Sequence, residues 1–539
     1  MKKFIKKIKS NKLLSILSVL IIGVFFILIA RVTYAYLALV FNSAKTDVMG
    51  SSDTVDDFKF ELGDPLKIDA TPTTLKENGT NYVTSTTAKA LLKANSTKNT
   101  ATYNYYVYFL IASNTFTYSD GSTPEIILTV TNPSGDEVTS IDGLTYGTFN
   151  GVSGFDVTTK EGTFNIANSY EITSNSSTSY ITQQWNITLT FLNLSIDQSS
   201  NFGNSMEVNV FIRKDILPTT LADVCNSGSN LASCITALSD KSVSNLTNIY
   251  YHDSSLANGA GDNSYRYAGA SESVNNFVCF GSTTSPCPTD NLYRIIGVFG
   301  ENNHGVSGQQ LVKLIKYDYA NSNLLGTDGD YASSGTPNAS YYKGSLTSID
   351  TYYWNYKAAN NASNEWSTSL LNKTNLNTNY LNNIGTKWSN MIEDATWRVS
   401  GYSTESVTPS EMYTAEITNA TKTYGPNNGK SKIGLMYASD YGFAASPSAW
   451  TKTLTNYEYN DVNGTSIKTI NWMYMGHSEW PITPFSSYDG DVFRLRASGY
   501  VNTGTADHSY GSRPVLYLKS SVLYAGGSGT KDSPITLVV

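Results

Sequence analysis

Hydrophobic and polar residues alternate with a period of two along much of the first half of the chain. Within QQWNITLTFLNL (183–194), large apolar residues occupy every second position from Trp185 to Phe191, and Asn or Thr fills the positions between them. EVNVFIR (207–213) repeats the alternation, so both segments are predicted strands with one buried face and one face in water. Segments 103–111 and 125–130 are apolar on both faces, which predicts central strands of a sandwich. One short helix is expected at TAKALLKAN (87–95).

The second half of the chain mixes strand and helix patterns. NLYRIIGVF (291–299) and QLVKLIKYD (310–318) predict a hairpin with a polar connection between them. Apolar residues over 366–384 follow a rough helical face, and 388–397 predicts a further helical turn. Additional strands are expected at 433–439, 492–498 and 514–520.

The N-terminal 35 residues carry six lysines and Arg31 but no acidic residue. An uncharged apolar run extends from Leu13 to Ala30, and eighteen helical residues reach about 27 Å, just short of the roughly 30 Å hydrocarbon core of a membrane. Lysines before the run keep the N-terminus inside the cell and direct the rest outward. The segment is therefore expected to be a membrane anchor, or a long signal peptide cleaved after Ala35.

Composition favours a β-rich chain that avoids nucleic acid. Of 539 residues only 15% are charged, while 38 are tyrosine, and this mix suits strands better than long helices. The formal charge is −7, and setting aside the seven basic residues of the N-terminal segment leaves 30 basic against 44 acidic residues. A surface of that sign repels phosphate backbones, which excludes nucleic-acid binding.

Four cysteines lie in the middle of the chain, with eight residues between Cys225 and Cys234 and seven between Cys279 and Cys287. Neither spacing is that of a zinc ribbon. In an exported protein the natural interpretation is two local disulfides, although four cysteines allow three connectivities. These bonds are expected to hold loops in place rather than to perform chemistry.

No arrangement of residues predicts catalysis, a cofactor or a metal. The four histidines are scattered, and no nucleophile elbow is accompanied by a base. Glu411 with Glu416, or His477 with Glu479, can be posed as acid and base, but such pairs arise by chance in a long chain. The Asp-Gly-Asp triplets at 328–330 and 489–491 are weak hints of calcium, for which a turn with exposed carboxylates is the favoured interpretation.

Arginines gather near the C-terminus, where Arg494, Arg496 and Arg513 are three of the eight in the chain. Arg494 and Arg496 are two apart on a predicted strand and so face one side, where Asp489, Asp491 or Asp507 can pair with them. The segment between Gly499 and Gly511 is a predicted loop, and the arginines are predicted to brace it as a structural clamp. The predicted ligand contacts are three residues of this loop and two tryptophans of an aromatic cluster before it: Tyr500, His508, Tyr510, Trp472 and Trp480.

The first half resembles the TasA and camelysin group of secreted bacterial matrix proteins. The resemblance rests on the apolar export segment ending in TYAY (33–36), on Phe58 and Phe60, and on WNITLTFLNLSIDQSSNFG (185–203). It implies a jelly-roll-like sandwich, processing by a dedicated signal peptidase, and assembly into fibres by donation of an N-terminal strand. In this chain Leu37 stands where an aromatic residue is more usual.

The second half resembles a surface-protein domain of unknown function found in Gram-positive-type gut bacteria. The shared phrases include NGAGDNSYRYAG (258–269), CPTDNLYRIIGVF (287–299), GLMYASDYGFA (434–444) and GSGTKDSPI (527–535). The closing arrangement of Phe-Arg-Leu-Arg and then Arg-Pro-Val is similar to the end of C-type-lectin-like domains of the formylglycine-generating-enzyme type. That similarity implies an α+β lectin-like fold but does not imply any particular function.

These patterns predict a mainly β, multi-domain protein. The expected parts are a basic segment and membrane or signal helix (1–35), a β-sandwich (36–213), a linker with a short helix (214–245) and a lectin-like domain (246–539). The expected function is adhesion or recognition at a bacterial cell surface or in its matrix, without catalysis, toward a glycan or a host or matrix protein. Two alternatives stay open: a self-assembling fibre subunit and an exported carbohydrate-active enzyme.

Overall fold

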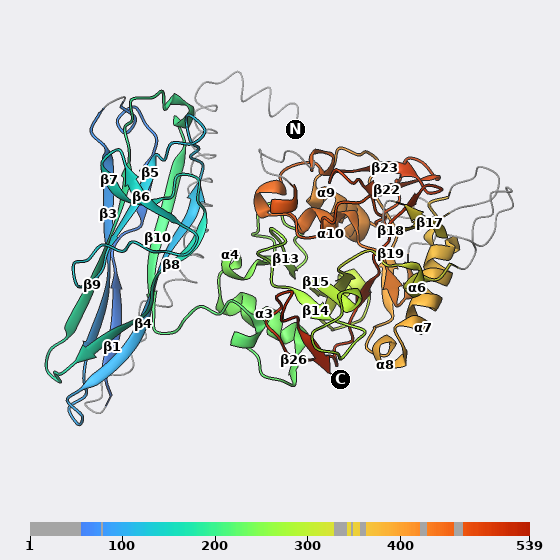
Figure 1. Cartoon of the computed structure of the whole chain (residues 1–539), viewed down its shortest axis with the longest axis horizontal. Coiled ribbons are helices and arrows are strands. Elements are labelled where there is room, and N and C mark those ends of the chain that lie inside the picture. The colour runs from blue at the N-terminus through green and yellow to red at the C-terminus, as the bar shows by residue number, and fades with distance from the viewer. Residues whose placement is uncertain are drawn as a thin grey trace, which may run out of the picture. The chain divides into compact units, whose positions relative to one another are not determined.

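A computed structural model describes residues 55–76, 79–327, 342–346, 349–355, 363–420, 428–457 and 467–538. The chain divides into two compact units, Met1–Ile216 and Leu217–Val539 (Figure 1). The predicted membrane or signal helix and the cleavage position at Ala35 lie outside the described residues. Within the described ranges, no helix is both long and apolar enough to cross a membrane.

The first unit is built from two antiparallel sheets, as the period-two alternation predicts. The six-stranded sheet has the order β1 (Asp57–Leu62), β3 (Tyr82–Lys93), β9 (Ile181–Phe191), β5 (Ile126–Thr131), β7 (Val152–Asp156) and β6 (Thr145–Phe149). The four-stranded sheet has the order β2 (Leu66–Asp69), β10 (Ser205–Arg213), β4 (Ala101–Asn114) and β8 (Gly162–Ser174). Apolar residues of both sheets form one hydrophobic cluster, so the unit is a β-sandwich.

The short helix predicted at 87–95 is wrong, because this segment belongs to strand β3. Alanine and leucine favour helices, yet β3 pairs with β1 on one side and β9 on the other. Ala88 and Ala90 are fully buried and Ala88 lies opposite Trp185, so small side chains make room for a large one. Tertiary packing thus overrides the local helix preference.

The second unit is organised around a seven-stranded antiparallel sheet. Its order is β12 (Ile249–His252), β13 (Ser264–Tyr267), β15 (Leu292–Phe299), β16 (Leu311–Lys316), β25 (Val515–Tyr517) and β21 (Ile433–Gly434), and β14 (Phe277–Cys279) also pairs with β15. The predicted hairpin is confirmed, since β15 pairs with β16 and the short helix α5 (Glu301–His304) lies in their connection. Every residue of β15 and β16 is buried, so this hairpin forms the centre of the core.

Smaller elements surround this sheet. The remaining strands are β11 (Ser229–Asn230), β26 (Leu523–Gly526) and β27 (Thr536–Val538); β17 (Tyr342–Leu346), β18 (Ile349–Tyr353) and β24 (Ser509–Tyr510); β19 (Ala395–Arg398) and β20 (Asn428–Ser431); and β22 (Asp491–Leu495) and β23 (Val501–Thr505). The α-helices are α3 (Leu231–Lys241), α4 (Ser244–Thr247), α6 (Ser322–Leu325), α7 (Leu381–Asn383), α8 (Thr386–Ser389), α9 (Pro409–Tyr413) and α10 (Ala438–Phe443). A π-helical stretch, Leu371–Tyr380, occupies the region of the predicted helical face.

The segment expected to be a linker, 214–245, is from Leu217 onward part of the second unit. It contains the helix α3, whose apolar residues Leu231, Ile235 and Leu238 are buried in the same hydrophobic cluster as the central sheet. Burial of these side chains fixes the segment against the sheet. The second unit therefore begins some thirty residues before the predicted boundary at 246.

Both disulfides form locally, as the cysteine spacing predicts. Cys225 bonds to Cys234 and Cys279 bonds to Cys287, with 5.8 Å between the Cα atoms in each pair. Disulfides of this kind are typical of extracellular or secreted proteins, where thiols are not kept reduced.

Replacing Cys225 and Cys234 together with Ala is expected to lower the free energy of unfolding of the second unit by about 2 to 3 kcal/mol. The bond closes a loop of sequence separation 9 and anchors the start of α3, whose Cys234 is fully buried. Alanine avoids leaving a buried hydroxyl without a partner. Chemical denaturation followed by tryptophan fluorescence measures the change, and an unchanged midpoint would show that the bond does not constrain the unfolded chain.

Candidate functional site

Arg513 forms a buried, bidentate ion pair with Glu479. Its Nε donates to Glu479 Oε2 at 2.7 Å and its Nη2 donates to Glu479 Oε1 at 2.6 Å. Nη2 also donates to the carbonyl oxygen of Met473 at 2.7 Å. Burial lowers the pKa of Arg513, but the Glu479 carboxylate outweighs burial and raises it overall. The Arg513–Glu479 pair is called the clamp below; from the sequence, Glu479 was posed only as an acid or base.

The clamp joins three segments of the chain. Glu479 makes backbone bridges to Leu495 at the end of β22 and to Gly511 after β24. Arg513 lies two residues before β25 of the central sheet. The pair therefore ties the edge of the β22–β23 hairpin to the core.

Arg494 does not pair with the aspartates expected for it. Its Nε donates to Asn502 Oδ1 at 3.0 Å and its Nη1 donates to the Tyr510 hydroxyl at 2.5 Å. Asn502 lies directly opposite Arg494 on β23 and Tyr510 lies on β24, so two neutral acceptors take the place of carboxylates. Arg496 follows the end of β22, and its backbone N–H donates to the carbonyl oxygen of Tyr500 in the turn to β23.

The predicted loop from Gly499 to Gly511 is mostly strand. Residues 501–505 form β23, paired with β22, and residues 509–510 form β24, paired with β18. The Asn-Thr-Gly-Thr sequence resembles a turn, but Gly504 lies in the strand with the end of the Arg494 side chain over it, so a larger residue here would displace the guanidinium. A Cβ at Gly504 would lie 2.7 Å from Arg494 Cζ.

The five residues predicted to contact a ligand do not form one site. Trp472 and Trp480 are buried, each 1% exposed, and their indole N–H groups donate to the carbonyl oxygens of Tyr267 and Tyr352. They cannot stack against a ligand from solvent, so that prediction is wrong for both. His508 is exposed, with its ring centroid 6.2 Å from that of Tyr510, and Tyr510 in turn packs on Trp480. Tyr500 is half-buried in the turn before β23.

The residues posed as acid–base or calcium candidates have structural partners. Glu411 closes a capping box with Thr408 at the start of α9. Glu416 is buried and accepts hydrogen bonds from the backbone N–H groups of Ala438 and Ser439 at the start of α10. Burial raises the pKa of Glu416 to about 7. In the described part of the chain no three His, Cys, Asp or Glu residues gather as a metal site, and the triplet at 328–330 lies outside it.

A groove of about 320 Å³ lies elsewhere in the second unit, beside the Cys279–Cys287 disulfide. One wall is the loop closed by that bond, and the other is the C-terminal segment from Asp532 to Leu537. A parallel bridge between Val278 and Ile535 holds the two walls together. Trp388 of α8 lines the groove between them, with its ring packed edge-on against Phe280 at 5.2 Å. The volume falls within the range of small-ligand sites, about 300 to 1,000 Å³.

The chemistry of the groove is polar but almost uncharged. Asp532 is its one charged lining residue, and Trp388, Leu537 and two prolines supply apolar surface. Hydroxyl groups dominate the remaining lining: Ser282, Thr283, Thr284, Ser285, Ser533 and Thr536. Hydroxyls and one carboxylate beside a small apolar surface suit a neutral ligand with many hydroxyl groups.

Sequence reasoning missed this groove because its parts are far apart in the chain. Residues 282–287, Trp388 and residues 532–537 meet only through the fold. The available signal was the Ser-Thr-Thr-Ser-Pro run inside the Cys279–Cys287 loop, but its disulfide was predicted only to hold that loop in place. No protein-family model matches the sequence, and a comparison with curated proteins finds no match either.

Proposed function

We propose that this chain is a bacterial cell-surface or extracellular-matrix protein that acts in recognition, and that the groove beside the Cys279–Cys287 disulfide binds a neutral saccharide. The observation that carries the proposal is the lining of that groove, in which six Ser and Thr residues and Asp532 lie together with the small exposed part of Trp388, a residue that is 7% exposed. Sugars present many hydroxyl groups, which exchange hydrogen bonds with Ser, Thr and Asp side chains, together with C–H groups that contact small apolar surfaces. One carboxylate gives an additional strong acceptor without attracting an anion.

Location outside the cytoplasmic membrane supports the same function. The N-terminal lysines followed by the apolar run 13–30 favour export, and the two disulfides are typical of an oxidising compartment. The resemblance of the second half to C-type-lectin-like and surface-protein domains is in keeping with a binding module. A non-catalytic role is favoured over hydrolysis, because glycoside hydrolysis uses two carboxylates and the groove lining holds one.

A second role, assembly into matrix fibres, is favoured by the first unit. It is a compact β-sandwich distinct from the recognition unit, and its sequence resembles TasA and camelysin. A jelly-roll-like topology and processing near Ala35 belong to this proposal. Electron microscopy of the secreted chain tests it: filaments are expected, and a chain that stays monomeric at high concentration would contradict it.

Filling the groove is expected to abolish adhesion. The exposed Thr536 lines the groove, so Thr536→Arg places a long charged side chain in it without disturbing the core. Bacteria displaying the full chain are expected to adhere to glycan-coated surfaces at least tenfold better than bacteria displaying the variant. Cell counts after washing measure the difference.

The control is Tyr488→Arg, which introduces the same charged side chain at an exposed residue that does not line the groove. Adhesion of this control should equal that of the unaltered chain. Equal adhesion of the Thr536→Arg variant would exclude the groove as the recognition site.

A further inference from the structure

Lys313 and Asp440 form a direct ion pair in the interior of the second unit. Lys313 lies on the central strand β16 and Asp440 on the helix α10, and Lys313 Nζ is 2.5 Å from Asp440 Oδ2. The side chains are 1% and 2% exposed. A lysine ammonium and a carboxylate in contact, both removed from water, are costly to keep charged unless many polar groups surround them.

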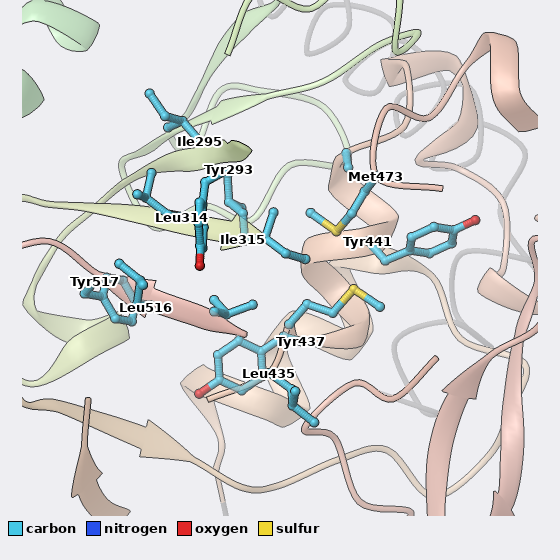
Figure 2. Close-up of a cluster of buried hydrophobic side chains, with 14 of the residues drawn as sticks. Tyr293, Ile295, Leu314, Ile315, Leu435, Tyr437, Tyr441, Met473, Leu516 and Tyr517 are labelled. Atoms are coloured by element: carbon cyan, nitrogen blue, oxygen red, sulfur yellow. The ribbon is translucent and has the colours of Figure 1, made fainter. Parts of the chain in front are cut away.

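The surroundings of the pair are mainly aromatic. Lys313 Nζ lies 4.4 Å from the ring centroid of Tyr437, 5.4 Å from that of Phe299 and 5.5 Å from that of Tyr517. Figure 2 shows Tyr437 and Tyr517 in this buried cluster, beside Leu435 and Leu516. Rings of this kind exclude water from the two reacting groups, and burial lowers the pKa of Lys313. The neutral form of the Lys313 amine therefore costs less free energy here than it would at the surface.

Three further groups bear on the carboxyl of Asp440, and the first is the backbone N–H of Tyr437, which donates to Oδ2 at 3.0 Å. Arg266 Nη1 lies 3.6 Å from Asp440 Oδ1, while the same guanidinium is held by Asp262 at 2.8 Å. Arg266 is thus fixed in place and can stabilise negative charge that develops on Oδ1. Glu416 accepts a hydrogen bond from the N–H of Ala438 in the first turn of α10, and burial raises its pKa to about 7, so below neutral pH this carboxyl is mostly uncharged.

We propose that Lys313 and Asp440 condense to an intramolecular amide, so that the mature protein carries a covalent cross-link between β16 and α10. The ammonium first transfers a proton to Asp440, which gives a neutral amine and a neutral acid. Lys313 Nζ attacks Asp440 Cγ, and Arg266 stabilises the oxygen that becomes negative. A second proton passes from nitrogen to the hydroxyl, the C–O bond breaks, and one water leaves. The reaction needs no oxidant, reductant or other reactant.

The cross-link fits the charge distribution and position of the pair. Amide formation removes one positive and one negative charge together, and the remaining Arg266–Asp262 pair is neutral as a whole. The new bond joins residues 127 positions apart in the sequence. It connects the central sheet to the helix packed on it, which would resist pulling or proteolysis of a surface protein.

Peptide mass spectrometry of the full chain tests the cross-link. The purified protein is reduced, unfolded and digested with trypsin, which cleaves after lysines whose amine is free. We expect no cleavage after Lys313 and a branched peptide that joins the segments holding Lys313 and Asp440, lighter than their sum by one water. Lys316 on the same strand is an internal control, because it is buried on β16 as well and is expected to be cleaved.

Cleavage after Lys313 with only linear peptides would overturn the proposal. Because this result comes from the unaltered chain, it does not depend on whether a variant folds. In Lys313→Arg, which keeps the charge and the trypsin site, the branched peptide must disappear. A branched peptide that persists in this variant would assign the cross-link to another residue and would also overturn the proposal.

Discussion

Replacing Arg513 with Met is expected to lower the free energy of unfolding of the second unit by about 3 to 5 kcal/mol. Methionine fills much of the same volume but leaves the Glu479 carboxylate, 1% exposed, without its bidentate partner. The carbonyl oxygen of Met473 loses a donor as well. Denaturant unfolding monitored by tryptophan fluorescence measures the loss.

A double variant separates the buried charge from lost packing. Arg513→Met combined with Glu479→Leu removes both charges, so most of the stability lost in the single variant should return. If the double variant is as unstable as Arg513→Met, the clamp acts through shape and not through its charges. A loss below about 1 kcal/mol in the single variant, the range of exposed ion pairs, would contradict the buried clamp altogether.

Raising the pH from about 4.5 to about 7 is expected to destabilise the second unit through Glu416. The pKa of this buried carboxyl is raised from 4.5 to about 7 in the folded protein. Within that window the folded state holds a proton that the unfolded chain has released, so stability falls as the pH rises. The loss from this group is on the order of 3 kcal/mol, is complete above pH 7 and is absent below pH 4.5.

Glu416→Gln isolates this contribution, because glutamine does not titrate. The difference in unfolding free energy between the variant and the unaltered chain should change across the window, while all other groups cancel. Glutamine keeps one oxygen to accept from the N–H of Ala438, which limits the structural disturbance. A difference that stays constant from acid to neutral pH would show that Glu416 ionises normally in the folded protein.

The strands were the part of the fold that the sequence predicted well. Alternation at 183–194 and the apolar runs at 291–299 and 310–318 correspond to β9, β15 and β16. A strand with one buried face has alternating apolar residues, and a strand with two buried faces has a continuous apolar run, so both patterns are visible in the sequence. The helix predicted at 87–95 was wrong because the alanines of this segment favour helices. Only the neighbouring strands β1 and β9 explain why small residues are needed there. The start of the second unit was missed for a similar reason, since the apolar face of α3 is short and polar residues surround it.

The candidate site was less predictable than the fold. Aromatic richness near Trp472 and Trp480 does not reveal exposure, and both residues are in the core. The Arg513–Glu479 pair joins residues 34 positions apart, and nothing in the local sequence links them. The groove depends on three segments that meet only after folding, whereas cysteine spacing and export favoured the local disulfides among three possible connectivities.

The most direct test of the proposed recognition function is binding of the purified full chain to an array of defined glycans. We expect binding to one or more neutral saccharides, loss of that binding in Thr536→Arg, and unchanged binding in Tyr488→Arg. An array without any bound neutral saccharide, or a Thr536→Arg variant that binds as well as the unaltered chain, would contradict it.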